Sequence, residues 1–353
     1  MPLSDLSAAI EEAITLPGVD GDKCVHAVIE QASCRACVEA CPHQAWLLDD
    51  EQLAMNTGRC DGCGICVTAC PQGAISHGFG PQIRSFRGRD IALVACERSG
   101  LDGDGVIPCL HALGLESLLE VTHLGAKVLM YSHGKCDSCD RSKSALSFVE
   151  LVANFHRLRK SHGLKRLSVV GYPPHDWEAR RRLLTGEAQG AECSRRGFLR
   201  GAFGSLLEKG VPGLSEQESG GQVPLATVLS ADRVRGLFPY VPVIDAERCV
   251  ACQACLQVCP HEAIRLNQEN LDYRIDARSC SGCNLCEDVC TEQAVSVQCW
   301  QEARGQVVLL EERRCKACGV PYRRVSQQEG DKSLCRICSE KKPHSKLYQV
   351  IEE

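Results

Sequence analysis

The chain has 353 residues, of which 26 are cysteines, and its formal net charge is −5. This length allows two or three domains, and the acidic balance argues against a nucleic-acid-binding protein. Aromatic residues make up only 5% of the chain, so we expect metal ligation to supply folding free energy that large apolar side chains do not.

The N-terminal segment MPLSDLSAAIEEAITLPGVD is acidic and has neither the basic region nor the apolar region of a secretory signal. No apolar stretch of the sequence reaches the length of a transmembrane segment. We therefore expect a cytoplasmic protein without a transmembrane segment. Thiols stay reduced there, and closely spaced cysteines indicate metal binding rather than disulfides.

Sixteen cysteines form four runs in two pairs. The first pair is Cys24, Cys34, Cys37, Cys41 and Cys60, Cys63, Cys66, Cys70, and the second is Cys249, Cys252, Cys255, Cys259 and Cys280, Cys283, Cys286, Cys290. Three runs read C-x2-C-x2-C-x3-C, the spacing that presents thiolates to a cubane iron–sulfur cluster. Residues 41–76 also align with residues 259–296, which predicts two compact modules with internal pseudo-symmetry.

In such a run three cysteines converge on one cluster, and the fourth ligates the neighbouring cluster. Cross-ligation then predicts four ligand sets. They are set I (Cys24, Cys34, Cys37, Cys70), set II (Cys60, Cys63, Cys66, Cys41), set III (Cys249, Cys252, Cys255, Cys290) and set IV (Cys280, Cys283, Cys286, Cys259). Four zinc knuckles or a disulfide framework are the alternatives, and the spacing disfavours both.

Two features depart from this pattern. Nine residues rather than two separate Cys24 from Cys34, so the first cluster has four irons if Cys24 ligates and three if it does not. The fourth run ends in Cys290-Thr291 without the proline of the other runs, but proline is not a ligand. Cys299 lies outside every run, and we expect it to be a buried thiol.

These residues make both modules resemble the bacterial-type ferredoxin domain that carries two [4Fe-4S] clusters, over roughly residues 20–80 and 245–300. The resemblance implies a duplicated, polyferredoxin-like protein that passes single electrons through four [4Fe-4S] clusters. Its partner would be a redox enzyme or electron-carrier protein, and the chain would be a subunit or partner of a formate dehydrogenase, hydrogenase or reductase.

Short β-branched runs at 90–96, 106–110, 126–132 and 166–172 alternate with helical periodicity at 113–125 and 142–163. This alternation predicts a small parallel α/β domain. Cys96, Cys109, Cys136 and Cys139 follow or end strands, so we expect them at the carboxyl edge of the sheet. The site would hold an iron–sulfur cluster or zinc, or Cys136 and Cys139 would form a redox-active dithiol.

The segment ALVAC…VIPCL…GAKVLMYSHGKCDSC resembles the small iron–sulfur subunits that relay electrons in methanogen-type hydrogenase and heterodisulfide reductase complexes. The same segment contains His111, His123 and His133. His133 is close enough in sequence to Cys136 to be a ligand or a proton carrier, but a loop histidine is more often a surface residue.

Ser194–Arg200 reads SRRGFLR and resembles a twin-arginine export signal. Because the segment is internal, we interpret it as a relic of gene fusion or as a helix start with Ser194 as the N-cap. Further along, Cys315, Cys318, Cys335 and Cys338 form two C-x2-C pairs with zinc-ribbon spacing. A structural zinc is expected there, and a further iron–sulfur cluster is the alternative.

The predicted fold is α+β and multidomain, with two ferredoxin-type dicluster domains flanking a parallel α/β domain and a zinc-ribbon-like tail. The boundaries are 1–84, 85–175, a linker at 176–244, 245–300 and 301–353. The sequence has no nucleotide fingerprint after a strand, no P-loop and no nucleophile elbow, which favours an electron carrier over an enzyme. Two alternatives stay open: a disulfide reductase that uses Cys136 and Cys139, and a maturation factor for a metalloenzyme.

Overall fold

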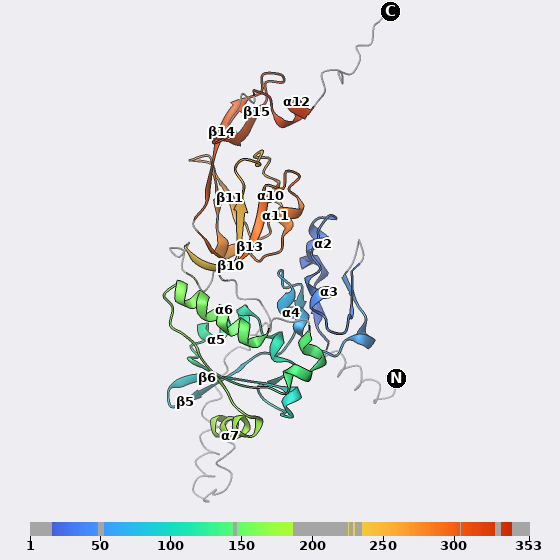
Figure 1. Ribbon diagram of the computed structural model, residues 1–353, viewed down its shortest axis with the longest axis vertical. Coiled ribbons are helices and arrows are strands. Elements are labelled where there is room, and N and C mark those ends of the chain that lie inside the picture. Colours follow the sequence, from blue (N-terminus) through green and yellow to red (C-terminus); the bar gives the residue numbers. More distant parts are fainter. Residues whose placement is uncertain are drawn as a thin grey trace, which may run out of the picture. The chain divides into compact units, whose positions relative to one another are not determined.

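The computed structural model describes residues 16–48, 53–143, 147–185, 225, 229, 235–303, 305–328 and 333–340, and the twin-arginine-like segment lies outside them. The protein is mixed α+β with several small sheets (Figure 1). It divides into two compact units: Met1–Ala27 with Arg35–Ser230, and Val28–Cys34 with Ala231–Glu353.

The first cysteine pair lies among short elements. In chain order these are β1 (Gly18–Val19), η1 (Gly21–Lys23), α2 (Val25–Val28), α3 (Ala36–Ala40), β2 (Trp46–Leu48), β3 (Leu53–Met55), η2 (Thr57–Arg59), α4 (Ile65–Ala69) and β4 (Ile75–Ser76). Strand β1 pairs antiparallel with β4, and β2 pairs antiparallel with β3. The small core between them contains Trp46, Cys66 and Ile75, all buried. Partly buried residues such as Val38 and Met55 pack around these three side chains.

An α/β domain follows in the same unit. Its elements are β5 (Gln82–Phe86), β6 (Arg89–Cys96), η3 (Glu97–Ser99), β7 (Val106–Ile107), η4 (Leu110–Ala112), α5 (Leu115–His123), β8 (Val128–Ser132), η5 (Cys136–Ser138), η6 (Asp140–Lys143), α6 (Phe148–Ser161), β9 (Ser168–Gly171) and α7 (Pro174–Thr185). Strand β6 is parallel to β7 and β8, and β8 is parallel to β9. The predicted parallel strands are thus confirmed, and β5 adds an antiparallel edge strand that the sequence did not reveal.

Helices cover both faces of this sheet (Figure 1). Leu118 of α5 and Phe155 of α6 pack on one face, whereas Trp177 of α7 packs on the other, against Leu93 and Met130. Helix α6 begins at a capping box, in which the Ser147 hydroxyl accepts from the Glu150 N–H at 3.2 Å. Two-sided burial explains why the strands are continuous apolar runs. Helix α7 occupies the start of the segment predicted to be a linker.

The second unit contains the second cysteine pair and the tail. Its elements are β10 (Gly236–Ile244), α10 (Ala254–Gln257), β11 (Ile264–Asn267), β12 (Asp272–Ile275), η8 (Ala277–Ser279), α11 (Leu285–Asp288), β13 (Val295–Ala303), β14 (Val307–Arg314), β15 (Pro321–Val325) and α12 (Arg336–Glu340). Strands β10 and β13 form an antiparallel ribbon, and the order β11-β12-β14-β15 forms one sheet. The tail strands therefore extend the sheet of the cysteine module.

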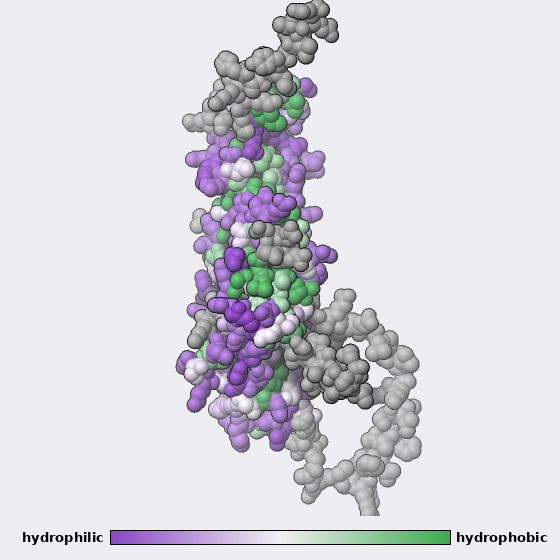
Figure 2. Space-filling view, turned by 90° about the vertical axis from the view of Figure 1, so that its right-hand side faces the viewer, coloured by the Kyte–Doolittle hydropathy of each residue, from purple (hydrophilic) through white to green (hydrophobic). Residues whose placement is uncertain are grey.

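The prediction that Cys299 is buried is wrong, because it lies exposed on the β13 strand of the ribbon. On the face shown in Figure 2, hydrophilic side chains cover most of the described surface, with hydrophobic side chains in small patches between them. Among the helices described, none has the length and apolar character needed to cross a membrane.

Candidate metal centres

The three uninterrupted cysteine runs share one backbone conformation. In each, the residues on both sides of the middle cysteine have positive φ, which bends the loop around a centre. These residues are Gly62 and Gly64 (69° and 74°), Ala251 and Gln253 (56° and 68°), and Gly282 and Asn284 (81° and 63°). Ala251 and Gln253 adopt this conformation without the freedom of glycine, so the surrounding structure must impose it. Successive backbone N–H groups in such turns form anion-binding nests that are typical of iron–sulfur sites.

A second shared feature follows the fourth cysteine of every run. The third residue after it has positive φ in all four cases, at Gln44, Gly73, Glu262 and Gln293. The next residue is a buried alanine in each case, and the N–H groups of Ala45, Ala263 and Ala294 donate back to the cysteine sulfur. These bonds measure 3.3 Å from Ala45 to Cys41, 3.3 Å from Ala263 to Cys259 and 3.2 Å from Ala294 to Cys290. Such bonds stabilise a thiolate and tune the potential of a cluster that it ligates.

In set II, Cys63 and Cys66 are 7% exposed each. Burial, partly offset by a hydrogen bond from Trp46 and reinforced by the neighbouring thiols of Cys60 and Cys41, raises the pKa of Cys66 to about 12. Cys41 belongs to the other run of the pair, so the thiol that cross-ligation assigns to set II lies near the thiols of Cys60 and Cys66. Thiols this buried ionise only when a cation replaces their protons.

Set IV lines one cavity of about 330 Å³ in the second unit, and all four of its cysteines contribute. Set III is similarly compact: burial, then the nearby Cys249, Cys252 and Cys290, raises the pKa of Cys255 to about 12. The structure thus brings together the cysteines that cross-ligation assigns to sets III and IV.

Set I is less complete. Cys24 ends the turn η1, just as Cys60 ends η2 and Cys280 ends η8, so its backbone matches that of a first ligand. Cys37 and Cys70 pack around the same small core. Cys34 belongs to the segment grouped with the second unit, and Arg35 has φ −129° where the other runs have a left-handed residue. Set I remains a prediction from sequence spacing.

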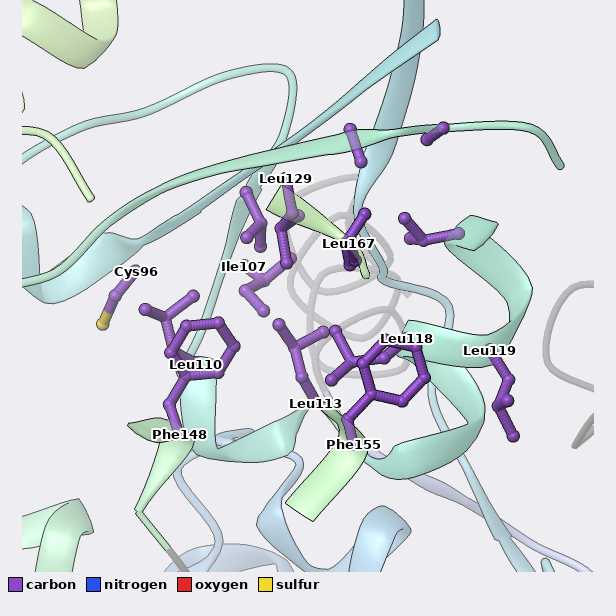
Figure 3. Packing of buried hydrophobic residues seen from close by; sticks show 14 residues of the cluster. Cys96, Ile107, Leu110, Leu113, Leu118, Leu119, Leu129, Phe148, Phe155 and Leu167 are labelled. Carbon is purple, nitrogen blue, oxygen red and sulfur yellow. The ribbon is translucent and has the colours of Figure 1, made fainter. Parts of the chain in front are cut away.

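The α/β domain brings Cys96, Cys109, Cys136 and Cys139 to one cavity of about 310 Å³, which we call the α/β pocket. It lies where β6, β7 and β8 end, at the carboxyl edge of the sheet. Figure 3 shows Cys96 at the margin of the hydrophobic core, with its sulfur directed away from the packed side chains. The Cys109 thiol hydrogen-bonds to Cys96 and lowers the pKa of Cys96.

Arginine, lysine and histidine side chains line the α/β pocket, and sequence reasoning missed the arginine and the lysine. Arg98, Lys135, His111 and His133 also line it, and His133 Nδ1 lies 3.9 Å from the sulfur of Cys136. The positive charges of Arg98 and Lys135 compensate an anionic thiolate-bound centre. His133 is exposed, as expected of a loop histidine, and it also borders the pocket.

The tail site comprises Cys315, Cys318, Cys335 and Cys338, whose sulfur atoms all lie within 4.8 Å of one another. The sulfur atoms of Cys318 and Cys335 are 3.8 Å apart. This is about the sulfur–sulfur distance in a tetrahedral site with Zn–S bonds of about 2.3 Å. The N–H of Cys335 donates to Cys315 at 3.2 Å and lowers the pKa of Cys315. This donor set fits one tetrahedral ion. Among the described residues, this is the one group of four cysteines whose sulfur atoms all lie within 4.8 Å of one another.

Comparison with known families supports the assignment of the two modules. Residues 32–75 match the family described as 4Fe-4S dicluster domain, and residues 242–265 match the 4Fe-4S binding domain. The chain therefore carries ferredoxin-type iron–sulfur cluster-binding domains in these two segments, together with a four-cysteine cluster near its C-terminus. Cys24 precedes the first match, and the run Cys280–Cys290 follows the second.

Proposed function

We propose that this chain is an electron-transfer protein in which sets I to IV each hold a [4Fe-4S] cluster. Such a cluster supplies a reversible one-electron couple, whose potential depends on hydrogen bonds to sulfur, burial and nearby charge. The repeated backbone N–H bonds to Cys41, Cys259 and Cys290 carry the proposal. They give the chain its own means of setting potentials in both modules.

The loops that carry these cysteines have features of rigid ligand loops. Left-handed residues fix the loops of sets II, III and IV, and buried neighbours such as Ile65 and Leu285 anchor the turns that follow the loops of sets II and IV. Rigid ligands suit one-electron transfer, in which a change of redox state should move few atoms. The chain would serve as subunit or partner of a larger redox enzyme, and its net charge of −5 favours a partner with a basic docking surface.

Two further centres complete the proposal. The tail site would hold a structural zinc that fastens β14 and β15 to α12. The α/β pocket would hold a further iron–sulfur centre, because its thiols do not meet the mutual closeness of the tail site and its lining is basic. A single zinc ion would need four sulfurs as close as those of the tail.

Metal analysis of anaerobically purified protein tests this composition. We expect roughly sixteen irons with equal sulfide in sets I to IV, one zinc in the tail and additional iron in the α/β pocket. Few irons with several zincs per chain would overturn the proposal.

Paired variants test the ligand sets. Cys280→Ala should lose about four irons, whereas Cys299→Ala, an exposed cysteine outside the runs, should lose none. If both variants keep the wild-type iron content, Cys280 is not a ligand. If both variants lose iron, the loss reflects unfolding rather than a missing ligand.

A further inference from the structure

Arg141 is a buried arginine that the cysteine pattern does not explain. It lies in η6, two residues after Cys139, and is only 3% exposed. Its guanidinium Nε donates to the Asp61 carboxylate, and its Nη2 donates to the Asp61 carbonyl at 3.3 Å. Its Nη1 donates to Glu97 Oε1 at 2.7 Å and to the Pro108 carbonyl at 2.7 Å. One side chain therefore holds three loops.

Each of these loops carries a cysteine of a candidate centre. Asp61 stands between Cys60 and Cys63 of set II, and its Oδ1 accepts from the Cys63 N–H at 3.2 Å. Glu97 directly follows Cys96, and Pro108 directly precedes Cys109. Arg141 thus contacts the loop of set II on one side and two loops of the α/β pocket on the other.

Direct packing joins the same two sites. Cys63, Ile65 and Cys109 form one buried cluster, in which Cys63 is 7% and Cys109 is 4% exposed. A Cβ placed on Gly64 would lie 3.3 Å from the Cβ of Ala112, so the residues that follow Cys63 and Cys109 also lie close together. Protein atoms rather than a layer of solvent fill the space between Cys63 and Cys109.

The positive charge of Arg141 changes the reduction potential of a nearby centre in one direction. A guanidinium is always protonated in proteins, and that of Arg141 forms ion pairs with Asp61 and Glu97. Reduction adds one electron to a thiolate-bound centre and makes it more negative. A buried positive charge nearby stabilises that reduced form because low polarizability strengthens the interaction. The reduction potential is therefore higher with Arg141 than without it.

We propose that Arg141 is a positioning residue that fixes the loop of set II against the α/β pocket and raises the reduction potential of the centre in set II. The inference rests on the proposed function, because it requires an iron–sulfur centre in set II. Asp61 and Glu97 are its counter-charges, and they orient the guanidinium between the two sites.

Redox titration of the complete, iron-loaded chain, followed by EPR, tests this role. In Arg141→Gln we expect the potential of one [4Fe-4S] signal to fall by about 59 mV, a tenfold change in its reduction equilibrium. Arg141→Lys keeps the charge and should restore most of this potential, although it cannot hold three loops and should unfold at lower temperature. A purely structural role would not separate the two variants in potential.

Arg181→Gln is the matched control. Arg181 is also enclosed and paired with a glutamate, Glu178, but it lies on α7, on the opposite face of the sheet from α5 and α6. This variant should lose stability while every potential stays in place. An Arg141→Gln protein with wild-type iron content and unchanged potentials, or potentials that shift equally in Arg181→Gln, would overturn the proposal.

Glu97→Gln provides a second test if the Arg141→Gln protein does not bind iron. It removes one counter-charge and leaves Arg141 in place, so the potential of the same signal should rise. An unchanged or lower potential would overturn the proposal. Failure of the proposed function is distinguishable, because the wild-type chain would then contain no [4Fe-4S] signal before any variant is compared.

Discussion

The ring of Phe79 packs directly on the backbone of Gly64, so closely that a Cβ on this glycine would lie 2.3 Å from the ring Cζ. Gly64 sits between Cys63 and Ile65 with φ +74°. The position therefore requires glycine for two reasons, the left-handed backbone and the aromatic contact. Phe79 in turn packs against the core of the α/β domain. This contact links the set II loop to that core.

We predict that Gly64→Ala destabilises the first unit. The left-handed backbone costs about 1–2 kcal/mol for alanine, and displacement of the Phe79 ring adds about 1–3 kcal/mol. Thermal unfolding of the iron-loaded protein measures the loss. Gly58→Ala is the matched control, since Gly58 has no positive φ and the nearest atom to a Cβ there is at 3.5 Å. Equal stability of the two variants would contradict the role of the Phe79 contact.

The tail site should hold zinc independently of the iron–sulfur sets. Cys335→Ala is expected to remove one zinc per chain and leave the iron content unchanged, because its sulfur belongs to a separate four-thiol group. Metal quantification after anaerobic purification checks this outcome. A loss of about four irons instead would show that the tail holds a cluster. Cys299→Ala, with an exposed thiol, should retain both metals.

Gln328 fastens the tail to the loop of set III. Its side-chain nitrogen lies within hydrogen-bond distance of the carbonyl oxygens of Ala246 (3.0 Å), Glu247 (2.9 Å) and Cys249 (2.8 Å), which share its two N–H donors. Gln328→Ala leaves these carbonyls without that donor, which should cost about 1–3 kcal/mol. The adjacent Gln327 is exposed, and Gln327→Ala should change stability by less than about 0.5 kcal/mol. Chemical denaturation of the holo-protein measures the loss of stability in each variant. Equal losses would show that Gln328 does not fasten the tail.

Local sequence signals predicted much of the fold. The β-branched runs became β6, β7, β8 and β9 because both faces of their sheet are buried, which selects continuous apolar strands. The cysteine spacing likewise predicted which thiols lie together in sets III and IV. Strand β5 was missed because its residues QIRSF alternate too weakly to separate an edge strand from a loop.

Contacts between residues far apart in the sequence could not be predicted from sequence patterns. Nothing in the tail indicates that β14 pairs with β12 rather than with β15 alone, because either arrangement buries the same alternating residues. Arg141 looked like an ordinary charged residue, and its partner Asp61 lies eighty positions away. Cys299 was taken for a core thiol, yet it lies on the exposed side of the β10–β13 ribbon.

Reversible reduction tests the proposed electron transfer most directly. We would titrate the anaerobically purified chain with electrons at controlled potential and follow unpaired spins by EPR. We predict uptake of at least about four electrons per chain, one for each of sets I to IV, with full recovery on reoxidation. A chain that contains its iron but accepts no electrons reversibly would contradict an electron-transfer function.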